Sequence, residues 1–123
     1  MDGDENHATT KKTSTDGVVT WKVKVNLSDD AKTMTVTDNL PNGVHLTGLV
    51  FGRHYSQTPV TISGNNISAL TGQYEWGATN MKVDGTISSD NVVTLNFSTT
   101  DGRTLKQSIG DNNDFWLTYT TAY

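Results

Sequence analysis

The sequence predicts an all-β fold, namely a β-sandwich of two antiparallel sheets. Its 123 residues are rich in threonine, serine, asparagine and glycine, and only 33% of them are hydrophobic. Apolar and polar residues alternate over short runs, which is typical of strands with one buried face. Turn-forming residues separate these runs, and no run has the pattern of an amphipathic helix, as expected for a sandwich. The length suits a single domain with its own core.

The clearest strand covers residues 18–26. Trp21, Val23 and Val25 alternate there with threonine and lysine, so the three apolar side chains are expected on the buried face. A turn at residues 15–17, which ends in glycine, separates this strand from the segment before it.

Two lysines, Lys11 and Lys12, lie in that preceding segment. Residues 8–14 are expected to form an edge strand rich in threonine. Residues 1–7 are short, polar and acidic, and are expected to be a disordered N-terminal tail. The folded domain is therefore predicted to cover residues 8–123.

The remaining strands are expected between turn signals such as Pro-Asn-Gly. They are assigned to residues 32–38, 44–51, 59–62, 67–70, 81–87, 92–97 and 115–123. Alternation also predicts which side chains share a face. In the first of these strands Asp38 is expected to share the inward face with Met34 and Val36. In the second, Leu46 and Val50 are expected on one face.

The last expected strand has the most regular alternation in the chain. Phe115, Leu117 and Tyr119 alternate with Trp116 and Thr118, so the first three are expected to face the core. The sequence contains no internal repeat, and nothing in it indicates a second domain.

Composition argues against several classes of function. The formal net charge of −4 does not suit a nucleic-acid-binding surface, and no apolar run is long enough to span a membrane. The chain lacks cysteine, its three histidines are not at metal-ligand spacing, and the acidic segment 111–114 lacks the spacing of a known calcium loop, so no metal or cofactor is expected. No catalytic motif of a turnover enzyme is present. The N-terminal residues do not resemble a secretory signal peptide.

Three short motifs carry a resemblance to a known family. They are Lys12-Thr13-Ser14 followed by Trp21 to Asn26, then Met34 to Leu40, and finally the alternating Phe115, Leu117, Tyr119 and Thr121. Their order and spacing resemble the immunoglobulin-like domains of Gram-positive surface adhesins of the collagen-binding, CnaA-like type. Ser14 departs from this pattern, because the family usually has glycine there. The resemblance implies an Ig-like sandwich, a role in adhesion and an extracellular location on the bacterial cell wall.

Many domains of that family form an isopeptide bond between a lysine of the first strand and an asparagine of the last, assisted by a buried acid. The resemblance implies that Lys12 is the reactive lysine, with Lys11 as second choice, and that Asp38 is the acid. The core around them is expected to contain Trp21, Val23, Val36, Phe115, Leu117 and Tyr119. The family's asparagine lies on a strand after the last motif. No such strand follows here, so the expected partner is a complementary strand or peptide that carries the asparagine.

Other interpretations remain open at this point. The lysine pair also suits a solvated edge strand that discourages aggregation, and Asp38 also suits the start of the turn that follows it. The alternative function is a non-covalent adhesin domain that binds a host extracellular-matrix protein or a glycan. In that case Tyr55, Tyr74 and Trp76 would line a sugar or peptide groove.

Overall fold

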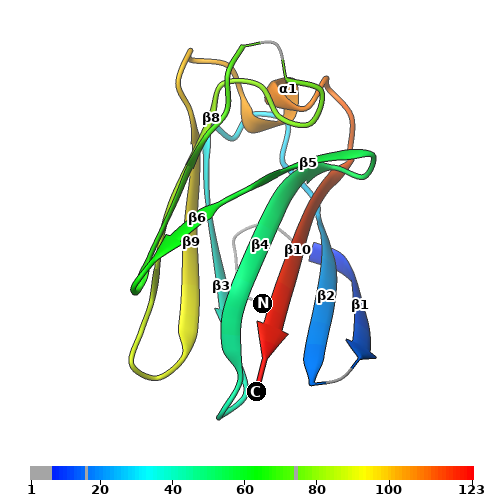
Figure 1. The fold of residues 1–123 in the computed structure, drawn as a ribbon. Helices are drawn as coiled ribbons and strands as arrows, with labels where there is room; N and C mark the ends of the chain where they lie inside the picture. Colours follow the sequence, from blue (N-terminus) through cyan, green and yellow to red (C-terminus); the bar gives the residue numbers. More distant parts are fainter. Residues whose placement is uncertain (1–6, 16, 74) are drawn as a thin grey trace.

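The computed structural model is an all-β sandwich, which confirms the predicted fold class (Figure 1). It describes the backbone of residues 7–15 and the whole of residues 17–73 and 75–123. Two antiparallel five-stranded sheets face each other, and a short helix, α1 (Leu105–Ser108), lies at one end of them.

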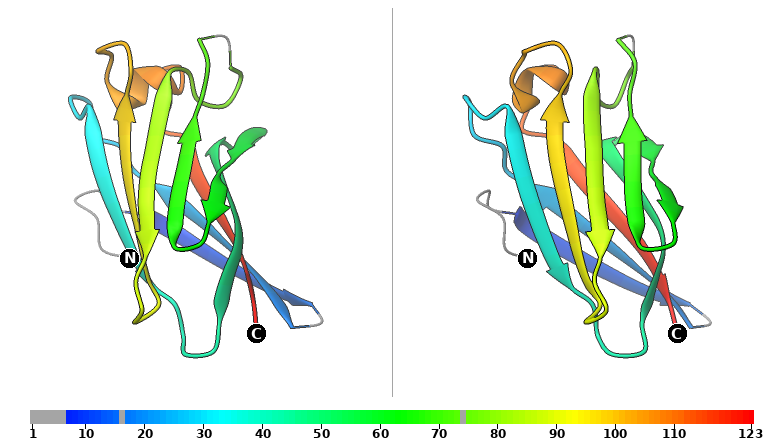
Figure 2. Two further views of the ribbon diagram at one scale, coloured as in Figure 1. Left: turned by 60° about the vertical axis from the view of Figure 1, so that its left-hand side comes forward. Right: turned by 90° about the vertical axis from the view of Figure 1, so that its left-hand side faces the viewer.

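Each sheet combines strands from distant parts of the chain. The first sheet has the order β1 (His7–Thr15), β2 (Val18–Val25), β10 (Phe115–Ala122), β4 (His45–Arg53) and β5 (Ser56–Pro59). The second sheet has the order β3 (Thr33–Asn39), β9 (Val92–Thr99), β8 (Met81–Ile87), β7 (Asn66–Leu70) and β6 (Thr61–Ser63). Figure 2 shows the second sheet in front, with the strands of the first crossing behind it at an angle.

Most of the predicted strands are present. The strands predicted at 81–87 and 92–97 are β8 and β9, which pair with each other, and the predicted edge strand at 8–14 is β1. β1 begins at His7, one residue earlier than predicted. The tail expected before it, residues 1–6, lies outside the described residues.

Two features differ from the prediction. The strand predicted at 59–62 is instead two strands, β5 and β6, separated at Val60, where the chain leaves one sheet for the other. The Val60 amide still donates to the carbonyl of Leu49 at 2.9 Å. Helix α1 was not predicted because its four residues are too few to show a helical period. A capping box between Thr104 and Gln107 stabilises its first turn.

Strand β4 contains a β-bulge that simple alternation does not predict. Between Leu46 and Gly48 the register against β10 shifts by one residue, which makes Thr47 the extra residue. Leu46 is buried before the bulge, and Leu49 is buried after it. Val50 therefore lies on the opposite face from Leu46, and the prediction that the two share a face is wrong.

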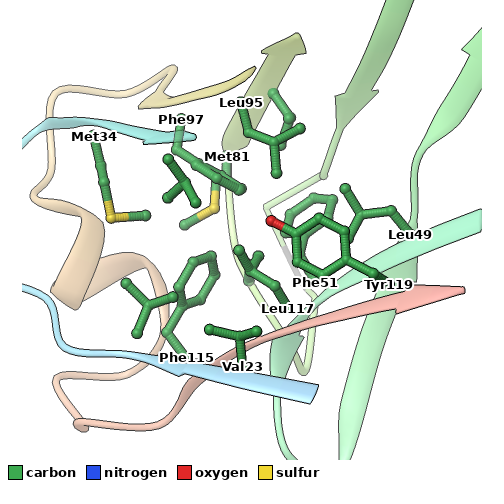
Figure 3. Packing of buried hydrophobic residues seen from close by; sticks show 14 of the residues in the cluster. Val23, Met34, Leu49, Phe51, Met81, Leu95, Phe97, Phe115, Leu117 and Tyr119 are labelled. Atoms are coloured by element: carbon green, nitrogen blue, oxygen red, sulfur yellow. The ribbon is translucent and has the colours of Figure 1, made fainter. Parts of the chain in front are cut away.

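Aromatic side chains fill the centre of the sandwich (Figure 3). Phe97 of β9 packs edge-on against Phe51 of β4 and Phe115 of β10, with ring centroids 5.9 and 5.4 Å apart. All three side chains are almost completely buried. Edge-to-face packing adds to the stabilisation that comes from burying the rings. This cluster joins the two sheets, and Leu105 and Ile109 cover it at the end where α1 lies.

The two sides of the sandwich are closed differently. On one side the chain passes directly from β5 to β6 through Val60, which links the edge strands of the two sheets. On the other side the edge strands are β1 and β3, and no described strand pairs with the outer edge of either. Such edges offer backbone N–H and C=O groups to a further strand. We refer to the side between β1 and β3 as the open side.

Candidate functional site

Strand pairing places residue 12 in a row of positions that face the core. Lys12 pairs with Trp21 of β2, and Trp21 pairs in turn with Tyr119 of β10. Tyr119 pairs with Leu49 of β4. Residues directly opposite each other on neighbouring strands share a face. Tyr119 and Leu49 are buried, and Trp21 is partly buried against the same core. We refer to Lys12, Trp21, Tyr119 and Leu49 as the lysine row.

The neighbouring lysine belongs to a row on the other face of the sheet. Lys11 pairs with Lys22, and Lys22 pairs with Thr118. Lys22 is exposed. The register of β1 and β2 therefore assigns position 12 to the inward row and position 11 to the outward row. The side chains of both lysines lie outside the described residues.

Asp38 lies near the end of β3, on the face turned toward the first sheet. It is half-buried and pairs with the fully buried Val93 of β9. Burial raises the pKa of the Asp38 carboxyl above its usual 3.8. Burial also raises the pKa of the Tyr119 hydroxyl, and the nearby Asp38 carboxylate raises it further. Asp38 therefore lies close to Tyr119, one member of the lysine row, on the facing sheet.

The turn after β3 does not depend on Asp38. Among the described residues, the side chain of Asp38 makes no hydrogen bond to this turn. The amide of Asn91 holds the turn instead, by donating to the carbonyls of Pro41 and Val44. The alternative in which Asp38 serves only to start the turn therefore has no support in these contacts.

The hydroxyl of Tyr119 is buried and has no hydrogen-bond partner among the described residues. Tyr119 is 0% exposed, and its oxygen points from β10 into the space between the sheets (Figure 3). An unpaired buried hydroxyl destabilises a folded protein by about 1–3 kcal/mol. Phenylalanine would fill nearly the same space without that penalty. Within the described part of the chain, the hydroxyl is therefore a donor without an acceptor, and it lies close to Asp38.

A short chain of hydrogen bonds fixes Trp21 in the lysine row. Its indole Nε1 donates to the Thr121 hydroxyl at 3.1 Å, and that hydroxyl donates to the Val19 carbonyl at 3.1 Å. Thr121 is completely buried. These bonds join β2 to β10 and orient the indole.

The other residues expected around the site are all buried in one cluster: Val23, Val36, Phe115 and Leu117. The polar roles of Tyr119 and Thr121 were not predicted from the sequence. The signal that could have identified them is the presence of hydroxyl groups at inward positions of an otherwise apolar alternation.

The acidic segment at 111–114 does not offer a free carboxylate at its end. Asp114 is hydrogen-bonded to the His54 ring at 2.7 Å and accepts from the Trp116 indole at 2.8 Å, and the Arg53 guanidinium lies 3.7 Å away. Burial opposes ionisation of Asp114, but the hydrogen bonds outweigh it and lower the pKa. Within residues 17–73 and 75–123, no group of three or more histidine or acidic side chains is placed to hold a metal.

A second candidate region is a pocket of about 260 Å³ beside α1. Trp76 and Tyr55 line it and are 79% and 51% exposed. The Tyr55 hydroxyl donates to the Trp76 carbonyl at 3.4 Å, and the Arg53 guanidinium lies 4.8 Å from the Tyr55 ring. Glu75 adds a carboxylate to the lining. Tyr74, the third aromatic residue predicted for this groove, lies outside the described residues.

Comparisons of the chain with protein-family models, with curated proteins and with solved structures found no match. In the described part of the chain, no helix has the length and apolar character needed to cross a membrane. The function is therefore argued from the lysine row, Asp38 and the open side.

Proposed function

We propose that the protein is an adhesive or structural module whose Lys12 forms an isopeptide bond with an asparagine of a complementary strand. The observation that carries the proposal is that the half-buried Asp38 lies close to Tyr119, which belongs to the same cross-strand row as Lys12. The bond forms once per molecule, so this is self-ligation and not turnover catalysis. On the family resemblance we also propose that the module acts at a bacterial cell surface.

The protonation states required for ligation are compatible with this site. A lysine amine attacks only in its neutral form, and its ordinary pKa is about 10.4. Burial disfavours the charged form of an amine, so the proposal requires that the incoming strand covers the Lys12 amine and keeps it neutral. The burial that raises the pKa of Asp38 likewise favours its neutral acid form. A neutral amine and a neutral acid can therefore coexist.

The proposed step exchanges one amide for another. The Nζ of Lys12 bonds to the side-chain carbonyl carbon of the asparagine, the bond from that carbon to the amide nitrogen breaks, and ammonia leaves. Asp38 donates a proton to the developing oxyanion and recovers it when the carbonyl re-forms. Asp38 also transfers one proton from the lysine nitrogen to the departing amide nitrogen, so it ends as it began. Fixing the three groups in contact supplies much of the acceleration.

The open side suits a partner that binds as a strand. β1 is nine residues long, and no described strand pairs with its outer edge. An extended peptide added at such an edge gains main-chain hydrogen bonds, while alternate side chains enter the sandwich. The asparagine must then occupy an inward position close to the lysine row.

Synthetic peptides test the proposal. We suggest a set of nine-residue peptides, matched to the length of β1, with alternating valine and threonine, arginine at each end and one asparagine moved through the inward positions. At least one peptide is expected to give an adduct lighter than the summed masses by one ammonia, measured by intact-protein mass spectrometry. Lys12→Ala is expected to abolish the adduct, whereas Lys11→Ala keeps it. If Lys12→Ala still forms the adduct, the lysine assignment is wrong.

The exposed aromatic residues beside α1 favour a second candidate function, which is reversible binding of a neutral glycan. The broad face of Trp76 is accessible and suits stacking on a sugar ring. The pocket beside it presents both the Glu75 carboxylate and the Arg103 guanidinium. Sugar hydroxyls both donate and accept hydrogen bonds, so a neutral sugar suits this mixed lining better than a strongly charged ligand does.

A titration with lactose and cellobiose, followed by NMR, tests this second function. The indole N–H signal of Trp76 is expected to shift on addition of sugar, and Trp76→Ala is expected to weaken binding by about tenfold or more. Leu70→Ala is the matched control, because Leu70 is 68% exposed and does not line this pocket. No shift of the Trp76 signal with either sugar would rule the site out.

A further inference from the structure

Charge is distributed unevenly between the first sheet and the rest of the chain. The strands of this sheet contain none of the 13 acidic residues, but they contain five of the nine lysines and arginines: Lys11, Lys12, Lys22, Lys24 and Arg53. The protein as a whole has a formal net charge of −4. Positive charge gathered on one part of a protein creates a local potential that attracts anions. This sheet is therefore where an anionic partner is expected to bind.

The outer face of the sheet carries two of these lysines. Lys22 and Lys24 alternate with the buried Val23 and Val25 on β2, so both belong to the outer face. Strand geometry places the Cα atoms of the two lysines about 7 Å apart. Among the described residues, neither lysine amine is paired with a carboxylate. Figure 1 shows β4, β10, β2 and β1 side by side, and the register puts position 11 of β1 in the same outward row as Lys22.

A small hollow of about 120 Å³ lies beside these lysines. Its lining consists of Lys22, His54, Gln57 and Trp116. The Lys24 amine lies 5.9 Å from the centroid of the Trp116 ring. The Thr118 hydroxyl donates to the side-chain oxygen of Gln57 at 3.0 Å, so the amide N–H groups of Gln57 remain able to donate to a ligand. The hollow therefore combines positive charge with hydrogen-bond donors, and none of the described residues that line it is acidic.

The Asp114 carboxylate contacts two of the lining residues, but other groups offset its charge. It accepts from the Trp116 indole at 2.8 Å, is hydrogen-bonded to the His54 ring at 2.7 Å, and lies 3.7 Å from the Arg53 guanidinium. These contacts fix the two rings at the hollow. Asp114 therefore positions the lining and is compatible with an anion bound there.

The pairing of the strands narrows the class of anion. β2 and β10 are paired on both sides, so their main-chain groups cannot pair with an added peptide strand. A ligand on this face must therefore be recognised by side chains. Thr20 and Thr120, which pair with each other at outward positions, add hydroxyl groups that both donate and accept. A polysaccharide with repeated acidic groups has the charges and the hydroxyls that suit such a surface.

We propose that the outer face of the first sheet binds an anionic polysaccharide, whose sulfate or carboxylate groups pair with Lys22 and Lys24. One acidic group enters the hollow and accepts from Gln57, and the sugar hydroxyls contact the outward threonines. Because Lys22 and Lys24 are separated along the strand, they contact successive charged groups of one chain. This surface lies on the opposite face of the sheet from the lysine row, so the inference does not depend on isopeptide ligation.

Dextran, dextran sulfate and carboxymethyl dextran test the inference, because they share one backbone and differ in charge. At least one charged polymer is expected to bind, measured by calorimetry, and to bind more weakly as salt is added. Uncharged dextran is expected not to bind. The double variant Lys22→Gln/Lys24→Gln is expected to bind about tenfold more weakly, because two exposed ion pairs are lost. The matched control is Lys32→Gln/Lys82→Gln, which changes the net charge equally at exposed positions outside the first sheet and is expected to keep the affinity.

The site of binding is checked by NMR with sucrose octasulfate, a small sulfated sugar, and with uncharged sucrose. The indole N–H signal of Trp116 is expected to shift with the sulfated sugar only. An unmoved Trp116 signal, equal weakening in the two double variants, or no binding of either charged dextran would overturn the inference. Polyglutamate, single-stranded DNA or phosphatidylglycerol vesicles might compete for the same lysines: binding of any of these at least as tight as that of the charged dextrans, and lost in Lys22→Gln/Lys24→Gln, would overturn the assignment to a polysaccharide.

Discussion

Replacing Phe97 with alanine is expected to lower the free energy of unfolding by about 3–5 kcal/mol, measured by urea denaturation. Phe97 is 1% exposed and packs edge-on against Phe51 and Phe115, which belong to the other sheet. Its removal leaves a cavity between the sheets and deletes two aromatic contacts at once.

The matched control for Phe97→Ala is Leu70→Ala, which removes an apolar side chain that is 68% exposed. We expect this control to change stability by less than about 0.5 kcal/mol. If Phe97→Ala destabilised the protein no more than the control does, the two sheets would not be held together by the central aromatic cluster.

Replacing Asp38 with asparagine is expected to have opposite effects on stability and on ligation. Asp38 has a raised pKa in the folded protein, so the folded state binds more protons than the unfolded state between the usual value of 3.8 and the raised value. Its contribution is therefore favourable at low pH and is lost as the pH rises through the raised pKa. The Asp38→Asn substitution keeps the shape of the side chain without the charge, so it is expected to make the protein more stable at pH 7.

The same substitution removes the group that carries protons in the proposed ligation. We expect the rate of adduct formation to fall by about 100-fold or more.

The pH dependence of stability contains contributions from other acids as well. Asp29, Asp101 and Asp114 have lowered pKa values, and their stabilising effect is lost on acidification. The contribution of Asp38 is therefore measured as the difference in the free energy of unfolding between the unsubstituted protein and the Asp38→Asn variant, by denaturation at a series of pH values. Asp90→Asn, at an exposed turn, is the control.

An Asp38→Asn variant that follows the unsubstituted protein in stability at every pH would show that Asp38 is solvated like an ordinary surface acid. Normal ligation by the same variant would show that the reaction needs no acid at this position. The first result removes the observation on which the proposed function depends, and the second removes the role proposed for Asp38.

The strands that could be predicted from the sequence are those in which every second residue is buried. β10 is the clearest case, because Phe115, Leu117 and Tyr119 are all buried and their neighbours are only partly so. Alternation failed in β4, where the bulge at Thr47 reverses the faces of the strand. It also failed near Val60, because strands of four and three residues are too short to show a period.

The candidate site could be predicted only in part, because it depends on which strands pair and in which register. Position 12 was preferred over position 11 from the family pattern, and the sequence of β1 is too uniformly polar for alternation to decide between them. Pairing with β2 separates them, since Lys12 is opposite Trp21 and Lys11 is opposite Lys22. The unpaired hydroxyl of Tyr119 depends on contacts across both sheets, which no local pattern in the sequence records.

The most direct test of the account is the location of the covalent bond. The protein is incubated with the asparagine peptides, digested with a protease that leaves lysine adducts intact, and analysed by tandem mass spectrometry. We expect the fragment spectra to place the peptide on Lys12, the member of the lysine row on the edge strand β1. A bond at Lys11, whose position lies in the outward row, or at any exposed lysine such as Lys22 or Lys82, would contradict the account.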